Sequence, residues 1–167
     1  DSGIVRDMDY PDDYRHLAAA LPHRLHPDAA ECEAMLDAAG TPEPTRRHSR
    51  VVAQLAVDIA TRLTAKGHAL DCAAVLAGAL LHDIAKGDPD HAAAGARRVS
   101  AFGFAEVAEI VAVHMECALE PGEAVDPRHV VCLADKLVKG ERLVGIEERF
   151  APAFSAFASD PAALAGV

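Results

Sequence analysis

The stretch Leu80-Leu81-His82-Asp83-Ile84-Ala85-Lys86 places a histidine and an aspartate directly after an apolar run that extends from Cys72 to Leu81. A run of this kind is expected to lie deep in the protein. Burying an imidazole and a carboxylate there costs on the order of several kcal/mol unless something compensates. A metal ion held by both groups is the usual compensation, but a hydrogen bond between His82 and Asp83 would also satisfy them. The pair alone leaves both explanations open.

The composition favours a single all-α domain. The 167-residue chain is long enough to bury a core, and it is rich in alanine with only 4% aromatic residues. Its formal net charge of −10 argues against general binding to nucleic acids or anionic membranes. No apolar run is long enough to span a membrane, and no signal segment opens the chain. The four cysteines are dispersed, which is typical of reduced core or near-core residues in a cytoplasmic protein: Cys32, Cys72, Cys117 and Cys132.

Periodic apolar residues and helix-end signals predict a helical bundle of about six to seven helices. The expected helices cover about residues 29–39, 45–66, 71–86, 88–102, 105–117, 128–139 and 141–150, and no strand pattern is present. The third is apolar on most faces, which predicts a central position. We expect residues 1–27 to be a linker or the tail of a preceding domain. Residues 28–150 would form the helical domain, and 151–167 a C-terminal tail.

Five of these helices turn a metal-ligand type of side chain towards the interior. The residues are His48, His82 with Asp83, His91, His114 and Asp135. Taken singly, His48 or His114 is better explained as a satisfied core histidine, and His91 as an ordinary first-turn residue. Asp135 alone is ambiguous, because an inward aspartate needs a partner and an arginine or lysine would serve. Taken together, unrelated polar residues on several apolar faces are a poor explanation. A cluster around one or two ions explains all of them.

The same residues resemble the signature of the HD-domain metal-dependent phosphohydrolases, an all-helical superfamily. The order His48, His82-Asp83, Asp135 matches the four positions that bind a divalent ion in that family. His82-Asp83-Ile84-Ala85-Lys86 is similar to the HDIGK variant, with Ala85 in place of glycine. Later elements are similar too: His91 with Gly95-Ala96, Val113-His114-Met115-Glu116 and Ala134-Asp135-Lys136. The resemblance covers about residues 45–140.

The resemblance implies a site for one or two ions. His48, His82, Asp83 and Asp135 would hold the first ion, and Asp83, His91 and His114 the second, so that Asp83 bridges them. Some binuclear members have a doubled histidine where this chain has only His114, so a single ion is also compatible with the sequence. Imidazole and carboxylate ligands suit Mn, Fe, Ni, Co or Zn better than Mg, although Mg would serve a mononuclear site.

The expected activity is hydrolysis of a nucleotide or another small phosphate ester by a metal-activated water. Asp83 would orient the nucleophile. Lys86 would contact the phosphate or protonate the leaving oxygen, or it would simply form an ion pair with Asp83. Arg47 and Lys136 are further candidates for holding the phosphate.

Two rival hypotheses remain. Some di-iron HD proteins are oxygenases, although nothing in this sequence specifically supports that chemistry. The other rival is a non-catalytic regulatory module that binds a nucleotide or metal, attached to a nucleotidyltransferase. Arg6–Tyr14 resembles the closing segment of sugar- and cofactor-nucleotidyltransferases. Ala134–Arg142, followed by Glu147–Phe150, resembles HD domains fused behind molybdenum cofactor cytidylyltransferase-like domains. We therefore expect an in-chain nucleotidyltransferase domain before Asp1.

Overall fold

The computed structural model describes residues 24–116, 118–120 and 122–156. Within these residues the chain forms seven helices and one two-stranded hairpin, which confirms the predicted all-α bundle. The helices are α2 (Ala29–Ala38), α3 (Glu43–Ala65), α4 (Cys72–Leu81), α5 (His91–Ala101), α6 (Ala105–Ala112), α7 (Pro127–Lys136) and α8 (Ile146–Ala156). None of these helices is long and apolar enough to cross a membrane.

Side-chain caps explain where several helices begin. Asp28 and Glu31 form the predicted capping box at the start of α2, each side chain accepting the other residue's backbone N–H. Asp71 caps α4 by accepting from two backbone N–H groups, and Asp126 caps α7 in the same way ahead of Pro127. These caps satisfy N–H groups that have no partner within their own helix.

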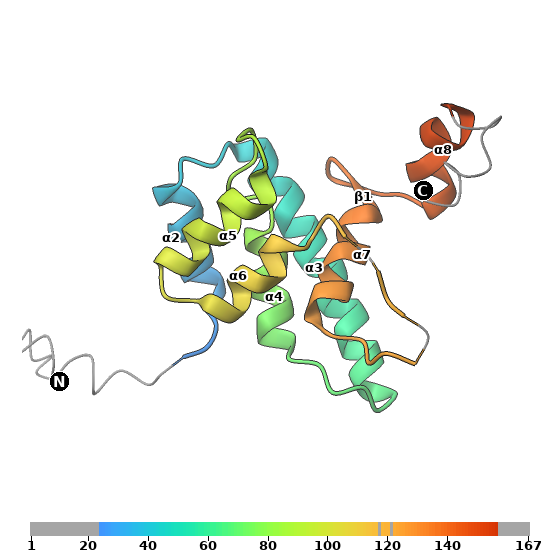
Figure 1. The fold of residues 1–167 in the computed structure, drawn as a ribbon, viewed down its shortest axis with the longest axis horizontal. Coiled ribbons are helices and arrows are strands. Elements are labelled where there is room, and N and C mark those ends of the chain that lie inside the picture. The colour runs from blue at the N-terminus through green and yellow to red at the C-terminus, as the bar shows by residue number, and fades with distance from the viewer. Residues whose placement is uncertain (1–23, 117, 121, 157–167) are drawn as a thin grey trace, which may run out of the picture.

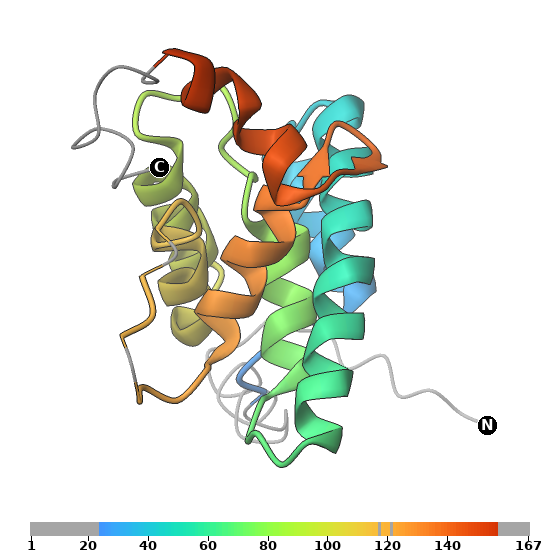
Figure 2. The ribbon, with the colours of Figure 1, turned by 90° about the vertical axis from the view of Figure 1, so that its right-hand side faces the viewer.

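Helix α4 is the centre of the bundle, as its apolar sequence predicts. It packs against α2, α3, α6 and α7, and Figure 2 shows α3, α4 and α7 running side by side with α5 and α6 next to them. Val75 and Leu81 of α4 are fully buried. The core therefore surrounds α4 and reaches the residue before His82.

A short hairpin between α7 and α8 corrects the sequence prediction of no strands. β1 (Val138–Lys139) pairs antiparallel with β2 (Arg142–Leu143). Gly140 has a φ of 63° in the connecting turn, a left-handed conformation that glycine adopts without strain. The predicted seventh helix consequently starts later, at Ile146 rather than residue 141, and α8 lies beyond the hairpin at one end of the bundle (Figures 1 and 2).

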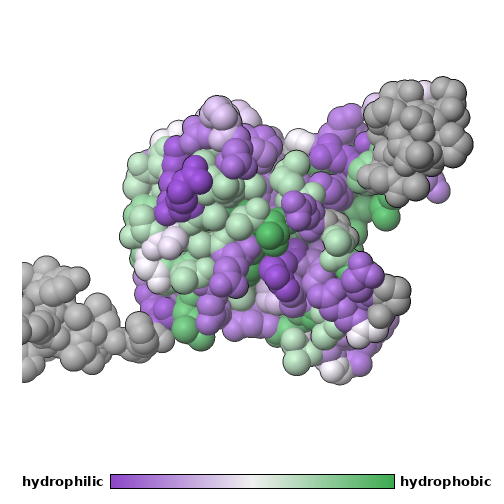
Figure 3. Space-filling model, in the orientation of Figure 1, coloured by the Kyte–Doolittle hydropathy of each residue, from purple (hydrophilic) through white to green (hydrophobic). Residues whose placement is uncertain are grey.

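The surface of the bundle mixes polar and apolar residues. In Figure 3 hydrophilic residues alternate with weakly hydrophobic ones over the visible face of the bundle.

Cys32 is buried and free, and Cys72 is partly buried and free, as predicted. Cys132, in contrast, is disulfide-bonded, so the expectation of four reduced cysteines is wrong at this position.

Candidate metal centre

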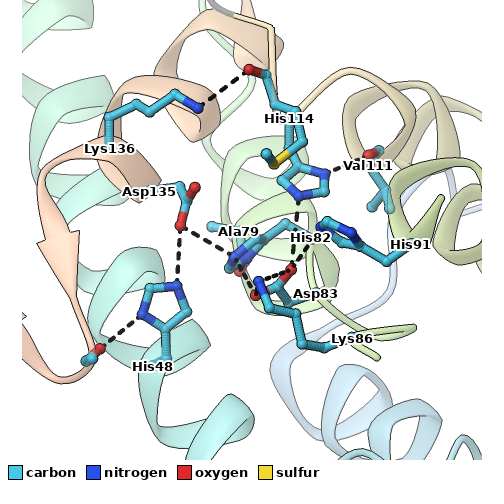
Figure 4. A network of polar contacts seen from close by, with 12 residues as sticks. His48, Ala79, His82, Asp83, Lys86, His91, Val111, His114, Asp135 and Lys136 are labelled. Atoms are coloured by element: carbon cyan, nitrogen blue, oxygen red, sulfur yellow. Dashed lines mark hydrogen bonds and ion pairs between the residues drawn. The ribbon is translucent and has the colours of Figure 1, made fainter. Parts of the chain in front are cut away.

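His82 and Asp83 lie immediately after α4 rather than within it, which corrects the predicted helix over residues 71–86. The helix ends at Leu81 and His82 is its C-cap, followed by turns. Both residues are buried, with exposures of 0% and 2%. The Nδ1 atom of His82 contacts the carbonyl oxygen of Ala79 at 2.8 Å. This contact orients the ring so that Nε2 faces the carboxylates described next (Figure 4).

His48 of α3 and Asp135 of α7 bring two further ligand types to the same place. Nε2 of His48 lies 3.0 Å from Oδ1 of Asp135, and Nδ1 of His48 lies 2.7 Å from the carbonyl oxygen of Gly140. Both ring nitrogens therefore face acceptors, although a neutral imidazole donates only one hydrogen bond. Either an extra proton or a metal ion is needed to make the second contact favourable.

His91 and His114 approach Asp83 from the opposite side. Nε2 of His91, at the start of α5, lies 3.4 Å from Oδ1 of Asp83, and Nε2 of His114 lies 3.7 Å from the same oxygen. His114 follows α6, and its Nδ1 contacts the carbonyl oxygen of Val111 at 2.7 Å. Figure 4 shows both imidazoles directed at Asp83.

These side chains form two groups with the geometry of metal ligands. One comprises His48, His82 and Asp83 and the other Asp83, His91 and His114, with the ligand atoms of each group within 4.8 Å of one another. Asp135 adjoins the first group, because its Oδ1 also lies 3.6 Å from Nε2 of His82. Asp83 is common to both groups. The structure thus brings all six predicted ligand residues together, from five separate segments of the chain.

Three buried nitrogen atoms test whether this donor set fits a metal. The Nε2 atoms of His82, His91 and His114 have no hydrogen-bond partner in the part of the chain that the structure describes. Leaving a buried polar atom unsatisfied costs about 1–3 kcal/mol. Ligands bound to one ion at about 2.1 Å lie about 3.0–3.5 Å apart, close to the 3.4–3.7 Å that separate these atoms from Asp83. The residues present therefore fit a divalent ion.

The close packing of carboxylates and imidazoles shifts the pKa values of the centre. Burial lowers the pKa of His82, but its contacts with Asp135 and Asp83 outweigh this and raise that pKa to about 9. Burial alone would raise the pKa of the Asp83 and Asp135 carboxyls. Nearby histidines, and Lys86 in the case of Asp83, outweigh burial and hold both pKa values well below the usual range. The pKa of His114 is lowered by burial. The carboxylates are ionised at neutral pH, as metal ligands must be.

A cavity of about 340 Å³ opens beside the cluster. Its lining includes His48, Asp83 and Asp135 together with Lys86, Lys139 and Arg149. A ligand in this cavity would therefore contact the metal-ligand residues and basic side chains at once. The volume lies at the small end of the range for ligand sites, which runs from about 300 to 1,000 Å³.

The three predicted phosphate-holding residues differ in position. Lys86 lines the cavity, and its Nζ lies 3.0 Å from Oδ2 of Asp83. Arg47 is outside the lining and pairs with Glu141 at 2.8 Å. Lys136 is also outside it and donates to the carbonyl oxygen of Met115 at 3.2 Å. The structure places Lys139 and Arg149 in the lining instead. The sequence indicates Lys139 as part of a local basic group with Lys136 and Arg142, but it gives no signal for Arg149.

Comparison with protein families agrees with this arrangement. The sequence model of the HD domain matches residues 45–140, more than half of the chain. The chain belongs to the HD-domain family. HD domains form a superfamily of metal-dependent phosphohydrolases. No curated protein and no solved structure matches the chain significantly.

The HD-domain match contains every predicted metal-ligand residue, from His48 to Asp135. It ends at Gly140, so β2 and α8 are additions to the matched region. The nucleotidyltransferase-like segment Arg6–Tyr14 lies outside the described residues, and its fusion partner stays a prediction.

Proposed function

We propose that this HD domain hydrolyses a phosphate ester of a nucleotide or a similarly small molecule, with one or two divalent ions as cofactors. The observation that carries the proposal is the convergence of three unsatisfied buried Nε2 atoms on the ionised Asp83. Without an ion, a proton on His82 would be stabilised by Asp83 and Asp135, but the Nε2 atoms of His91 and His114 would still have no hydrogen-bond partner among the described residues. The HD-domain family supports the reaction type.

The roles of the ligands follow from their positions. His48, His82, Asp83 and Asp135 would hold one ion, and Asp83, His91 and His114 the other. Bound divalent ions supply Lewis-acid chemistry, which lowers the pKa of water at the site and neutralises charge on the phosphoryl group. Manganese, iron, cobalt, nickel and zinc suit these ligands, and magnesium suits a single-ion version.

Asp83 and Lys86 would act on the reacting groups. Asp83 belongs to both ligand groups, so its carboxylate would set the position of the attacking water relative to the phosphate. The Lys86 ammonium lies beside Asp83 with its side chain 52% exposed, so it has access both to the centre and to solvent. From there it would hold a phosphate oxygen and deliver a proton to the leaving oxygen.

The test begins with protein stripped by a chelator and reloaded with each ion in turn. It is then assayed against a panel of nucleotides and small phosphate esters. We expect release of phosphate with at least one ion, and Lys86→Ala should reduce kcat by about ten-fold or more. Lys66→Ala, an exposed lysine beyond α3, is the matched control. Binding without any product would favour a regulatory module instead.

We also propose that the domain is the C-terminal part of a fusion with a nucleotidyltransferase-like domain. The support is the sequence of Arg6–Tyr14 and of the tract after Ala134. Residues 1–27 would then be the connecting segment, 28–150 the HD domain and 151–167 its tail. The coding sequence upstream of Asp1 tests this directly.

A further inference from the structure

The cavity beside the metal centre is lined by both acidic and basic side chains. Asp83 and Asp135 are the acidic ones, and both are among the predicted metal-ligand residues. Lys86, Lys139 and Arg149 are the basic ones. This cluster of cations stands out in a chain with 26 acidic and only 16 basic residues.

Lys139 and Arg149 differ from most other basic side chains of the described chain, which are engaged with carboxylates. Arg98 pairs with Asp88 at 2.7 Å, and Arg142, on the strand next to Lys139, pairs with Glu148. Within the described residues neither Lys139 nor Arg149 forms an ion pair with a nitrogen–oxygen distance of 4.0 Å or less. Lys139 is nevertheless near enough to Glu148 to help Arg142 lower the pKa of that carboxyl. Two cations facing one cavity repel each other unless an anion lies between them.

Lys86 does not fill the same role. Its ammonium is already in contact with Asp83, 3.0 Å away, and so belongs to the metal centre. Lys139 comes from β1 and Arg149 from α8, which lies beyond the matched HD region. The hairpin returns the chain so that both residues line the cavity. Together they form a second basic position at the cavity, apart from Lys86, which we call the basic rim.

We propose that the substrate is a compact molecule with two phosphate groups, one reacting at the metal centre and the other held by Lys139 and Arg149. This inference rests on the proposed phosphohydrolase function and narrows its substrate class. An arginine binds a phosphate through paired N–H donors and a lysine adds a point charge. The cavity of about 340 Å³ is lined by metal-ligand residues and by the basic rim, so one small molecule inside it would contact both.

The test measures binding rather than turnover. Manganese-loaded protein is titrated calorimetrically with methylenediphosphonate, which has two phosphonates and no hydrolysable ester, and with methylphosphonate, which has one. We expect the diphosphonate to bind at least about ten-fold more tightly. Arg149→Ala and Lys139→Ala should each remove most of that advantage and leave methylphosphonate binding unchanged. The manganese content of the protein is measured after each titration, and an unchanged content shows that the ligand has not removed the ion.

Arg128→Ala is the matched control, because Arg128 is exposed, pairs with Asp126 and is outside this cavity. It changes the net charge by the same amount as Arg149→Ala or Lys139→Ala, and it should bind both ligands as the wild type does. Wild-type diphosphonate affinity in Arg149→Ala and Lys139→Ala would overturn the proposal, and so would an equal loss in Arg128→Ala. If the rim variants lose the diphosphonate but no ester is ever hydrolysed, the basic rim stands and the proposed hydrolysis fails. If esters are hydrolysed but the rim variants behave as wild type, only the basic rim fails.

Discussion

The Nε2 atom of His114 lies 3.7 Å from Oδ1 of Asp83, yet within the described chain this buried nitrogen has no hydrogen-bond partner. The ring is fixed from its other side, because Nδ1 contacts the carbonyl oxygen of Val111. A neutral imidazole held this way directs a lone pair at a carboxylate, which is unfavourable unless a cation lies between them. The relationship therefore points to an ion between the two residues.

Replacing His114 tests the second ion. His114→Ala should lower the metal content of the reloaded protein by about one ion per chain, because Asp83 and His91 alone are too few ligands. The fold should persist, since the change removes an unsatisfied buried group. Elemental analysis with circular dichroism measures both effects. His68→Ala, at an exposed histidine, is the control, and unchanged metal content in His114→Ala would indicate a single-ion site.

The pH dependence of stability tests the charge of the metal-free centre. The pKa of His82 is raised from 6.5 to about 9 in the folded protein, so folding stabilises the protonated ring. This contribution is fully present below pH 6.5 and is lost as the pH rises through about 9. Chemical unfolding of chelator-treated protein should therefore give a free energy of unfolding that falls over this interval.

Manganese-loaded protein provides the comparison. An ion bound to His82 displaces the proton, so metal binding strengthens as pH rises. The fall in stability should accordingly be absent or reversed in the loaded sample. A free energy of unfolding that stays flat between pH 6.5 and 9 in the metal-free protein would contradict the charge assignment.

Gly78 tests the packing that supports the site. A Cβ at this position would lie 2.6 Å from Cγ2 of Ile110, a buried residue of α6. Gly78→Ala should therefore push α4 and α6 apart and destabilise the domain by about 1–3 kcal/mol, despite the better helix propensity of alanine. Gly145→Ala is the control, because no atom lies within 4 Å of its Cβ position. Equal stability of the two variants in urea unfolding would show that the contact is not tight.

The apolar periodicity of the helices predicted which side chains face the interior, and the resemblance to the HD-domain family assigned them to one or two ions. His48 and Asp135 belong to α3 and α7, and both point to the interior as expected. The hairpin escaped prediction because strands of two residues are too short to show alternation. Its turn reverses the chain beside the site, and this placement of Lys139 and Arg149 depends on tertiary structure.

The sequence pattern also could not predict where α4 ends. The apolar residues continue through Ile84 and Ala85, both buried, so periodicity gives no stop signal at Leu81. Polar contacts decide it instead: the carbonyl oxygen of Ile84 accepts from Thr41 at 3.1 Å and from Arg98 at 3.2 Å. These contacts hold the turn after His82 and Asp83 in place of a further helical turn.

The most direct test of the central claim is the metal content of Asp83→Asn after reloading with manganese. Asp83 is the residue shared by both ligand groups, and asparagine keeps its shape without its charge. We predict loss of both ions and of phosphatase activity, whereas Asp58→Asn, at an exposed position on α3, should bind manganese as the wild type does. Retention of wild-type metal content by Asp83→Asn would contradict the account of a metal centre built on this carboxylate.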